Sequence, residues 1–154
     1  ICIINIYILI KKYIFGEKNM TELDLWNHLW MASGSNATWF IGLGFLSWVG
    51  LRAGQNIYNN PDTPLLMKIS ATVFCLFVAN GWITNFAFSE WNANGVANAM
   101  TSIQEEGAIL SSYANELIAA TDPGAAFSLM PDVIQGLFVA SILIMSIGPM
   151  WVKK

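Results

Sequence analysis

Few residues in this 154-residue chain have the side chains needed for catalysis or metal binding. His28 is the only histidine, and Asp24 precedes it by four residues, so both would lie on one helix face. Such a pair could form half of a metal site that another chain completes. It could equally be the polar side of a short interfacial helix, since Trp26 and Trp30 suit a membrane surface. We favour the interfacial interpretation.

The rest of the sequence lacks the usual signatures of catalysis. Neither Cys2 nor Cys75 has a nearby cysteine or histidine. The sequence contains no phosphate-binding loop, zinc-protease motif, haem-attachment motif or nucleophile elbow. We therefore expect no enzyme activity, no metal site and no intrinsic cofactor. The net charge of −3 and the absence of a basic cluster argue against a nucleic-acid partner.

A second group of candidate residues lies within an apolar run. Asn80, Thr84 and Asn85 are polar, and polar groups in hydrocarbon are costly unless they find partners. Hydrogen bonds between helices would account for them, and we favour that explanation. The alternative is the lining of a channel, a carrier or a cofactor site. The predicted spans contain no Asp, Glu or Arg near their middle, which argues against a proton relay or a charged-ion pathway.

The composition indicates a membrane protein. Hydrophobic residues make up 55% of the chain and charged residues 11%, against about 25% charged in soluble domains. Three windows, residues 31–52, 65–88 and 133–152, are long enough to cross a bilayer. The predicted fold class is an all-α integral membrane protein with these three spans, an N-terminal interfacial helix and an extracytoplasmic amphipathic helix. We treat 20–154 as one membrane domain and give 1–19, an uncertain arm, little weight because Met20 is a plausible start.

The positive charges predict an orientation. Arg52 and Lys68 flank the first connection, and Lys153 and Lys154 follow the third span. The connection 89–132 has no lysine or arginine. Because positive residues collect on the cytoplasmic side, the C-terminus is expected inside and the long connection outside. The N-terminal side of the first span is then also outside, in a cytoplasmic membrane of bacterial or archaeal type.

The long outer connection carries a regular apolar stripe. Its members are spaced alternately by four and three residues, which is typical of one helix face: Val96, Met100, Ile103, Gly107, Leu110, Ala114 and Leu117. Such a stripe must lie against something. The candidates are the chain itself, the membrane surface or a neighbouring subunit.

Small residues mark two further packing faces. They are Gly44, Ser47, Gly50 and Gly54 in the first span, and Gly136 and Ala140 in the third. Small residues let transmembrane helices approach closely, either within one chain or between subunits.

These features predict a non-catalytic accessory subunit of a multi-subunit membrane complex. The chain is similar in shape and composition to small auxiliary subunits of membrane oxidoreductase or monooxygenase assemblies, which is an analogy and not a family match. The expected partners are other integral membrane subunits, in a hetero-oligomer in preference to a homo-oligomer, together with lipid. One alternative is a self-assembling channel or carrier for a small neutral solute. Another is a metal- or electron-handling subunit that uses His28.

Overall fold

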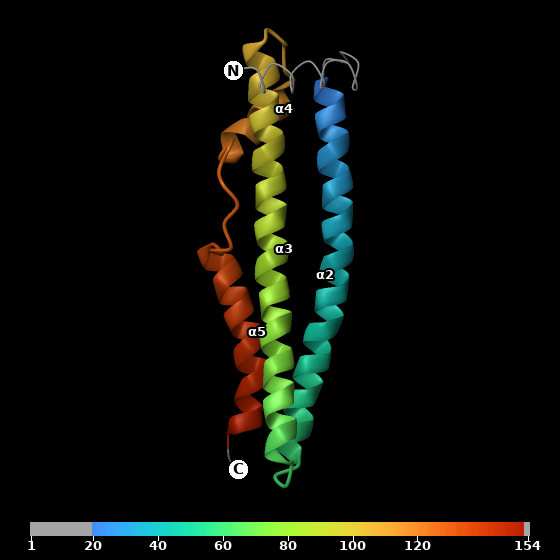
Figure 1. The fold of residues 1–154 in the computed structure, drawn as a ribbon, viewed down its shortest axis with the longest axis vertical. Coiled ribbons are helices and arrows are strands. Elements are labelled where there is room, and N and C mark those ends of the chain that lie inside the picture. Colours follow the sequence, from blue (N-terminus) through green and yellow to red (C-terminus); the bar gives the residue numbers. More distant parts are fainter. Residues whose placement is uncertain (1–19, 153–154) are drawn as a thin grey trace, which may run out of the picture.

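The computed structural model describes residues 20–152, and in that range all regular secondary structure is helical, without strands. Two long helices, α2 (Glu22–Asn59) and α3 (Leu65–Glu105), run antiparallel to each other. Figure 1 shows α5 (Val133–Trp151) beside the end of this pair that holds the α2–α3 turn. The short helix α4 (Ser112–Ala120) lies at the opposite end. The predicted arm, residues 1–19, lies outside the described residues.

The predicted interfacial helix is part of α2 and not a separate element. A capping box starts α2: the Asp24 amide donates to Thr21 Oγ1 at 3.3 Å, and the Thr21 amide donates to Asp24 Oδ2 at 3.1 Å. From there the helix continues without a break for 38 residues. No proline interrupts it before Pro61, so nothing in the backbone separates the first turns from the predicted span.

Two of the described helices are long and apolar enough to cross a membrane. They are α3 and α5, and α2 does not belong to this set. The predicted first span begins with a polar stretch containing Ser33, Ser35 and Asn36, and Arg52 lies near its other end, which lowers its hydropathy. The predicted second and third spans thus coincide with apolar helices, and the crossing by α2 remains a prediction.

The apolar stripe of the outer connection is divided between two helices, whereas the sequence predicted one. Helix α3 ends at Glu105, and Gly107 adopts a φ of +97°, which favours glycine. The Ala108 amide donates to the Ile103 carbonyl at 3.0 Å, a bond typical of helix termination at a glycine. Gly107 fits the spacing of the stripe but is the residue at which the helix ends.

The stripe packs against its own chain. Val96, Met100, Leu110 and Ala114 are all buried, and they form one cluster with Leu25 of α2. Ile103 and Leu117 pack against the edge of this cluster. The cluster therefore joins the start of α2, the end of α3 and α4 into a small helical head.

Two further clusters, nearer the α2–α3 turn, hold α2 and α5 against α3. The first consists of Leu43, Val78, Ala79, Trp82 and Val139. The second consists of Ile57, Cys75 and Met150. Each cluster contains residues of all three helices, so α2 is an integral part of the bundle formed with the two apolar helices.

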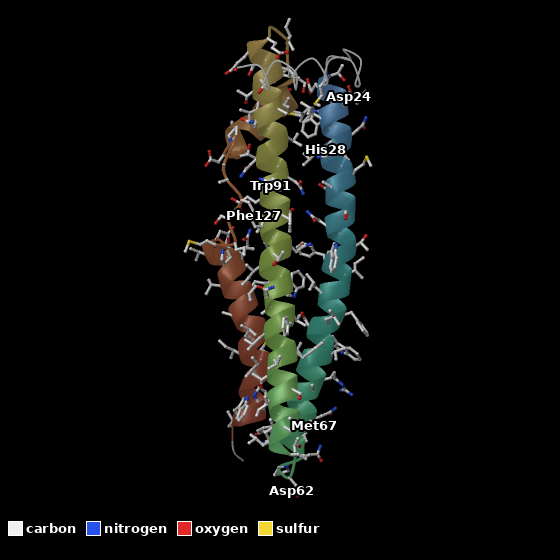
Figure 2. The ribbon with its side chains drawn as sticks, viewed as in Figure 1. Asp24, His28, Asp62, Met67, Trp91 and Phe127 are labelled. Carbon is white, nitrogen blue, oxygen red and sulfur yellow. The ribbon has the colours of Figure 1, made fainter. Side chains whose placement is uncertain are left out.

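The segment between α4 and α5 returns along α3. The Asp122 amide donates to Asn94 Oδ1 at 3.1 Å. Farther along, the Phe127 ring lies 5.1 Å from that of Phe88 and 6.0 Å from that of Trp91 (Figure 2). The segment ends at Asp132, which caps α5. These contacts fix where α5 begins relative to α3.

Glu22 connects the start of α2 to the start of α4. Its carboxylate accepts hydrogen bonds from the Ser111 amide at 2.9 Å and from the Ser111 hydroxyl. It also accepts a bond from Trp26 Nε1 at 2.9 Å. These bonds, the Ser111 hydroxyl foremost, hold the pKa of Glu22 below its usual value of 4.5.

We expect Glu22→Gln to loosen α4. Because the folded-state pKa is lowered, the contact stabilises α4 fully above about pH 4.5 and loses this effect as pH falls through the folded-state pKa. Hydrogen exchange of the amides in residues 112–120 should accelerate on acidification in the native chain. In the variant, exchange should be faster at neutral pH and should depend less on pH. Equal exchange in both proteins would contradict the role of Glu22.

Candidate binding groove

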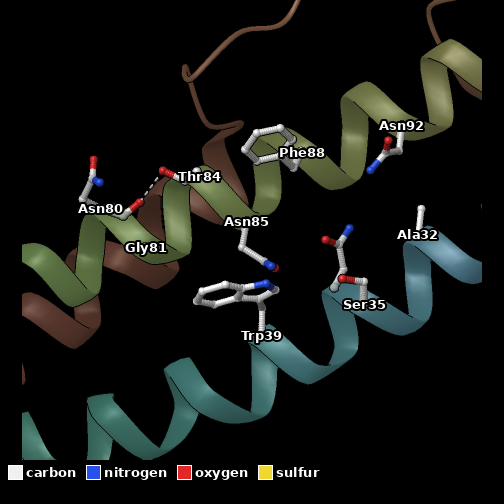
Figure 3. Close-up of a pocket in the computed structure, with 10 residues that line it drawn as sticks. Ala32, Ser35, Trp39, Asn80, Gly81, Thr84, Asn85, Phe88 and Asn92 are labelled. Carbon is white, nitrogen blue, oxygen red and sulfur yellow. Dashed lines mark hydrogen bonds between the residues drawn. The ribbon is translucent and has the colours of Figure 1, made fainter.

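A groove of about 510 Å³ lies between α2 and α3. Figure 3 shows it as the space between the two helices, with side chains entering from both. Its lining combines apolar groups with hydroxyls and amides: Ala32, Ser35, Asn36, Trp39, Asn80, Gly81, Thr84, Asn85, Phe88 and Asn92. The lining contains no charged side chain. Apolar walls with a few polar groups are typical of small-molecule sites.

Asn85 is the most unusual member of this lining. Its side chain is 7% exposed, and its buried Oδ1 has no hydrogen-bond partner among the described residues. In Figure 3 the amide extends from α3 toward Trp39 on α2. A buried acceptor without a donor destabilises a fold by about 1–3 kcal/mol. Asn85 is therefore the residue at which this groove can be expected to hold a donor group.

The other two polar residues predicted for this span are arranged differently. The Thr84 hydroxyl donates to the Asn80 carbonyl of its own helix at 2.8 Å, so its hydrogen is already used. The Asn80 side chain is exposed, and in Figure 3 it points away from α2. The predicted set thus divides into an inward amide, Asn85, and an outward one, Asn80.

The Asp24–His28 pair lies beside a second hollow of about 490 Å³, nearer the start of α2. Asn92 lines both hollows. The Asp24 carboxylate accepts hydrogen bonds from the Thr21 amide and hydroxyl, so it takes part in the helix cap. His28 is exposed (Figure 2). Within residues 20–152, no three His, Cys, Asp or Glu side chains are grouped closely enough to hold a metal ion.

The predicted small-residue faces also divide into two groups. Gly50 and Gly54 are buried inside the chain, where a Cβ on Gly50 would lie 3.1 Å from Cys75 Sγ and one on Gly54 would clash with the Ser146 carbonyl oxygen. Ser47 is also buried. Gly44 faces open space, and the nearest atom to a Cβ on Gly136 would be Pro131 Cγ at 3.9 Å. Ala140 is exposed.

Sequence reasoning missed the α2 side of the groove. Ser35, Asn36 and Trp39 lie within the predicted span 31–52, and nothing in the sequence marked them as lining a groove with Asn85. On α3, Asn92 was also missed. Its seven-residue separation from Asn85 puts both on one helix face, which is the signal that would have found it. The pairing of these faces depends on how α2 and α3 pack.

Comparison with known proteins gives no relative: no family model, no curated protein and no solved structure matches the chain.

Proposed function

We propose that this chain is a three-span, non-catalytic accessory subunit of a multi-subunit membrane complex. The observation that carries the proposal is the large apolar surface of a thin bundle. In the most apolar windows of α3 and α5, 22% and 17% of the residues are buried within the chain. The remaining surface suits lipid and the helices of other subunits.

The same reasoning supports α2 as the third span. Leu43 and Ile57 of α2 pack against the two apolar helices, so this part of α2 lies at the same level as they do. Its outer side carries Ile41, Phe45 and Trp48, which are 76%, 61% and 56% exposed. Large apolar side chains beside two membrane spans are best accommodated in the same hydrocarbon layer.

The lengths of the helices suggest how far the chain extends from the bilayer. At 1.5 Å per residue, α5 is about 28 Å long, close to the ~30 Å hydrocarbon thickness, whereas α2 and α3 are about 57 Å and 61 Å. The head around Leu25 and Met100 would therefore stand outside the membrane. The placement of Arg52 and Lys68 favours a cytoplasmic position for the α2–α3 turn, in a bacterial or archaeal cytoplasmic membrane.

Gly44 marks the face that we propose for a partner helix. It is exposed, a Cβ added there would meet nothing within 4 Å, and Ile41 and Trp48 lie on the same side of α2. Gly50 and Gly54 are not available to a partner, because they already pack against Cys75 and Ser146 of the same chain. Gly136 and Ala140 form a second accessible site on α5.

Purification in mild detergent tests the accessory role. A tagged chain recovered from its native membrane should migrate on a native gel with several different polypeptides. Gly44→Leu should reduce the recovery of those polypeptides about tenfold, equivalent to about 1.4 kcal/mol. Gly42→Leu is the matched control, because Gly42 also faces open space but, two residues from Gly44, lies on nearly the opposite side of α2. Recovery of the chain alone would contradict the proposal.

The groove at Asn85 supports a second candidate, a self-assembling channel or carrier for a small neutral solute. In that case the purified chain would form a homo-oligomer. Solute flux into vesicles would then fall when Asn85 is replaced by leucine. A hetero-oligomer without flux would favour the accessory role.

A further inference from the structure

We propose that the groove between α2 and α3 binds a neutral lipid bearing a free hydroxyl group, which donates a hydrogen bond to Asn85 Oδ1. The proposal depends on the membrane topology given above and goes beyond the accessory role. It begins from the buried Asn85 acceptor, which has no partner among the described residues. Oδ1 itself has almost no accessible surface, so the amide must turn about its soft χ2 torsion to meet a ligand in the groove. In a bundle exposed to hydrocarbon, a ligand that brings a donor to this atom removes its desolvation cost.

The groove favours a neutral ligand over a charged one. Its polar lining consists of amides and hydroxyls, contributed by Ser35, Asn36, Asn85 and Asn92, among others. Amides both donate and accept, so they complement a hydroxyl group, which does the same. A phosphate or an ammonium group would enter a partly apolar groove without an opposite charge, which is unfavourable.

The depth of the groove in the membrane also favours a lipid without a charged headgroup. Phe86, the neighbour of Asn85, has its ring centroid 6.1 Å from that of Phe138, the sixth residue of α5. Asn85 therefore lies about 8 Å inside the start of α5, and Asn92 about 10 Å farther out. The groove extends from the outer part of the hydrocarbon layer, at Asn85, toward the headgroup region, at Asn92. A hydroxyl at Asn85 therefore lies below the headgroup level, a depth that favours a lipid without a charged headgroup.

The size and walls of the groove suit the upper part of a lipid molecule. Its volume of about 510 Å³ is far above the ~30 Å³ of one water molecule and within the range of small-molecule sites. Trp39 and Phe88 provide apolar surface from opposite helices. The groove is open at its side, so acyl chains could continue into the bilayer while the hydroxyl end lies at Asn85.

Native mass spectrometry of the purified full chain tests the proposal with dioleoylglycerol and its methyl ether. The ether has the same acyl chains and is one methyl group larger, and it carries O–CH₃ in place of the donor O–H. The native chain should retain one dioleoylglycerol and bind the ether about tenfold more weakly. Asn85→Leu should bind dioleoylglycerol about tenfold more weakly than the native chain, and it should not distinguish the two lipids.

Two further variants make the result decisive. Asn27→Leu changes an exposed asparagine of α2 that does not line the groove, and it should bind like the native chain. Ala32→Phe fills the groove from α2 without altering Asn85, so it should weaken the binding of both lipids. This variant tests the site even if Asn85→Leu fails to fold. Equal binding of the two lipids by the native chain, or unchanged binding in Ala32→Phe, would overturn the site. Neither result would bear on whether the chain co-purifies with other subunits.

Discussion

Replacing Trp82 by alanine should destabilise the bundle by about 3–5 kcal/mol, the range for removing a buried aromatic side chain. Trp82 is 4% exposed and lies in the cluster that joins α2, α3 and α5. Its ring centroid lies 4.9 Å from that of Phe40 on α2 and 5.1 Å from that of Phe138 on α5, both in edge-to-face geometry. One residue thus connects all three helices.

The hydrogen bond of Trp82 provides the matched control. Its Nε1 donates to Ser47 Oγ at 2.9 Å, while the Ser47 hydroxyl donates to the Leu43 carbonyl at 2.8 Å. Ser47→Ala removes the acceptor and should cost about 1–3 kcal/mol, less than loss of the ring. Denaturant unfolding in detergent, followed by circular dichroism, measures both changes. A Trp82→Ala protein as stable as the native one would contradict the packing of the bundle.

Gly54→Leu should have an effect of similar size, for a different reason. A Cβ at Gly54 would clash with the carbonyl oxygen of Ser146, a backbone atom that cannot rotate away as a side chain can. The helices α2 and α5 would have to separate, at a cost of about 3 kcal/mol or more. We expect low yield in the membrane fraction and a lower melting temperature in detergent.

Gly44→Leu is the control for this prediction. It introduces the same side chain into the same helix, but toward open space, so the isolated chain should keep its melting temperature. Its effect should appear only in the recovery of partner subunits. Equal stability of the two variants would contradict the close packing of α2 against α5 at Gly54.

The helical fold and the positions of α3 and α5 were predictable from local sequence. Apolar runs of about 20 residues, bounded by prolines or charged residues, mark both helices, which begin at residues 65 and 133 as predicted. The lengths of α2 and α3 were not predictable in this way, because the Asn, Ser and Ala residues outside the apolar runs are compatible with either a helix or a loop. At Gly107 the stripe spacing favoured a continuous helix, although a positive φ at glycine ends it.

The contacts that make the groove and the head depend on residues far apart in the chain. Glu22 meets Ser111 across 89 positions, and Trp82 meets Ser47 across 35. A single sequence supplies the residue types in these pairs but not their pairing. The polarity of Asn85 was therefore recognisable, whereas its position opposite Trp39 required the arrangement of α2 against α3.

Both proposals depend on three crossings, and single-cysteine labelling tests this most directly. In a chain with its native cysteines replaced, Asn27→Cys, Asp62→Cys and Ser112→Cys probe the start of α2, the α2–α3 turn and the start of α4, all at exposed positions. An impermeant maleimide added to intact cells should label Asn27→Cys and Ser112→Cys, and should reach Asp62→Cys only after permeabilisation. Labelling of Asn27→Cys and Asp62→Cys from the same side would show that α2 does not cross the membrane and would contradict the account.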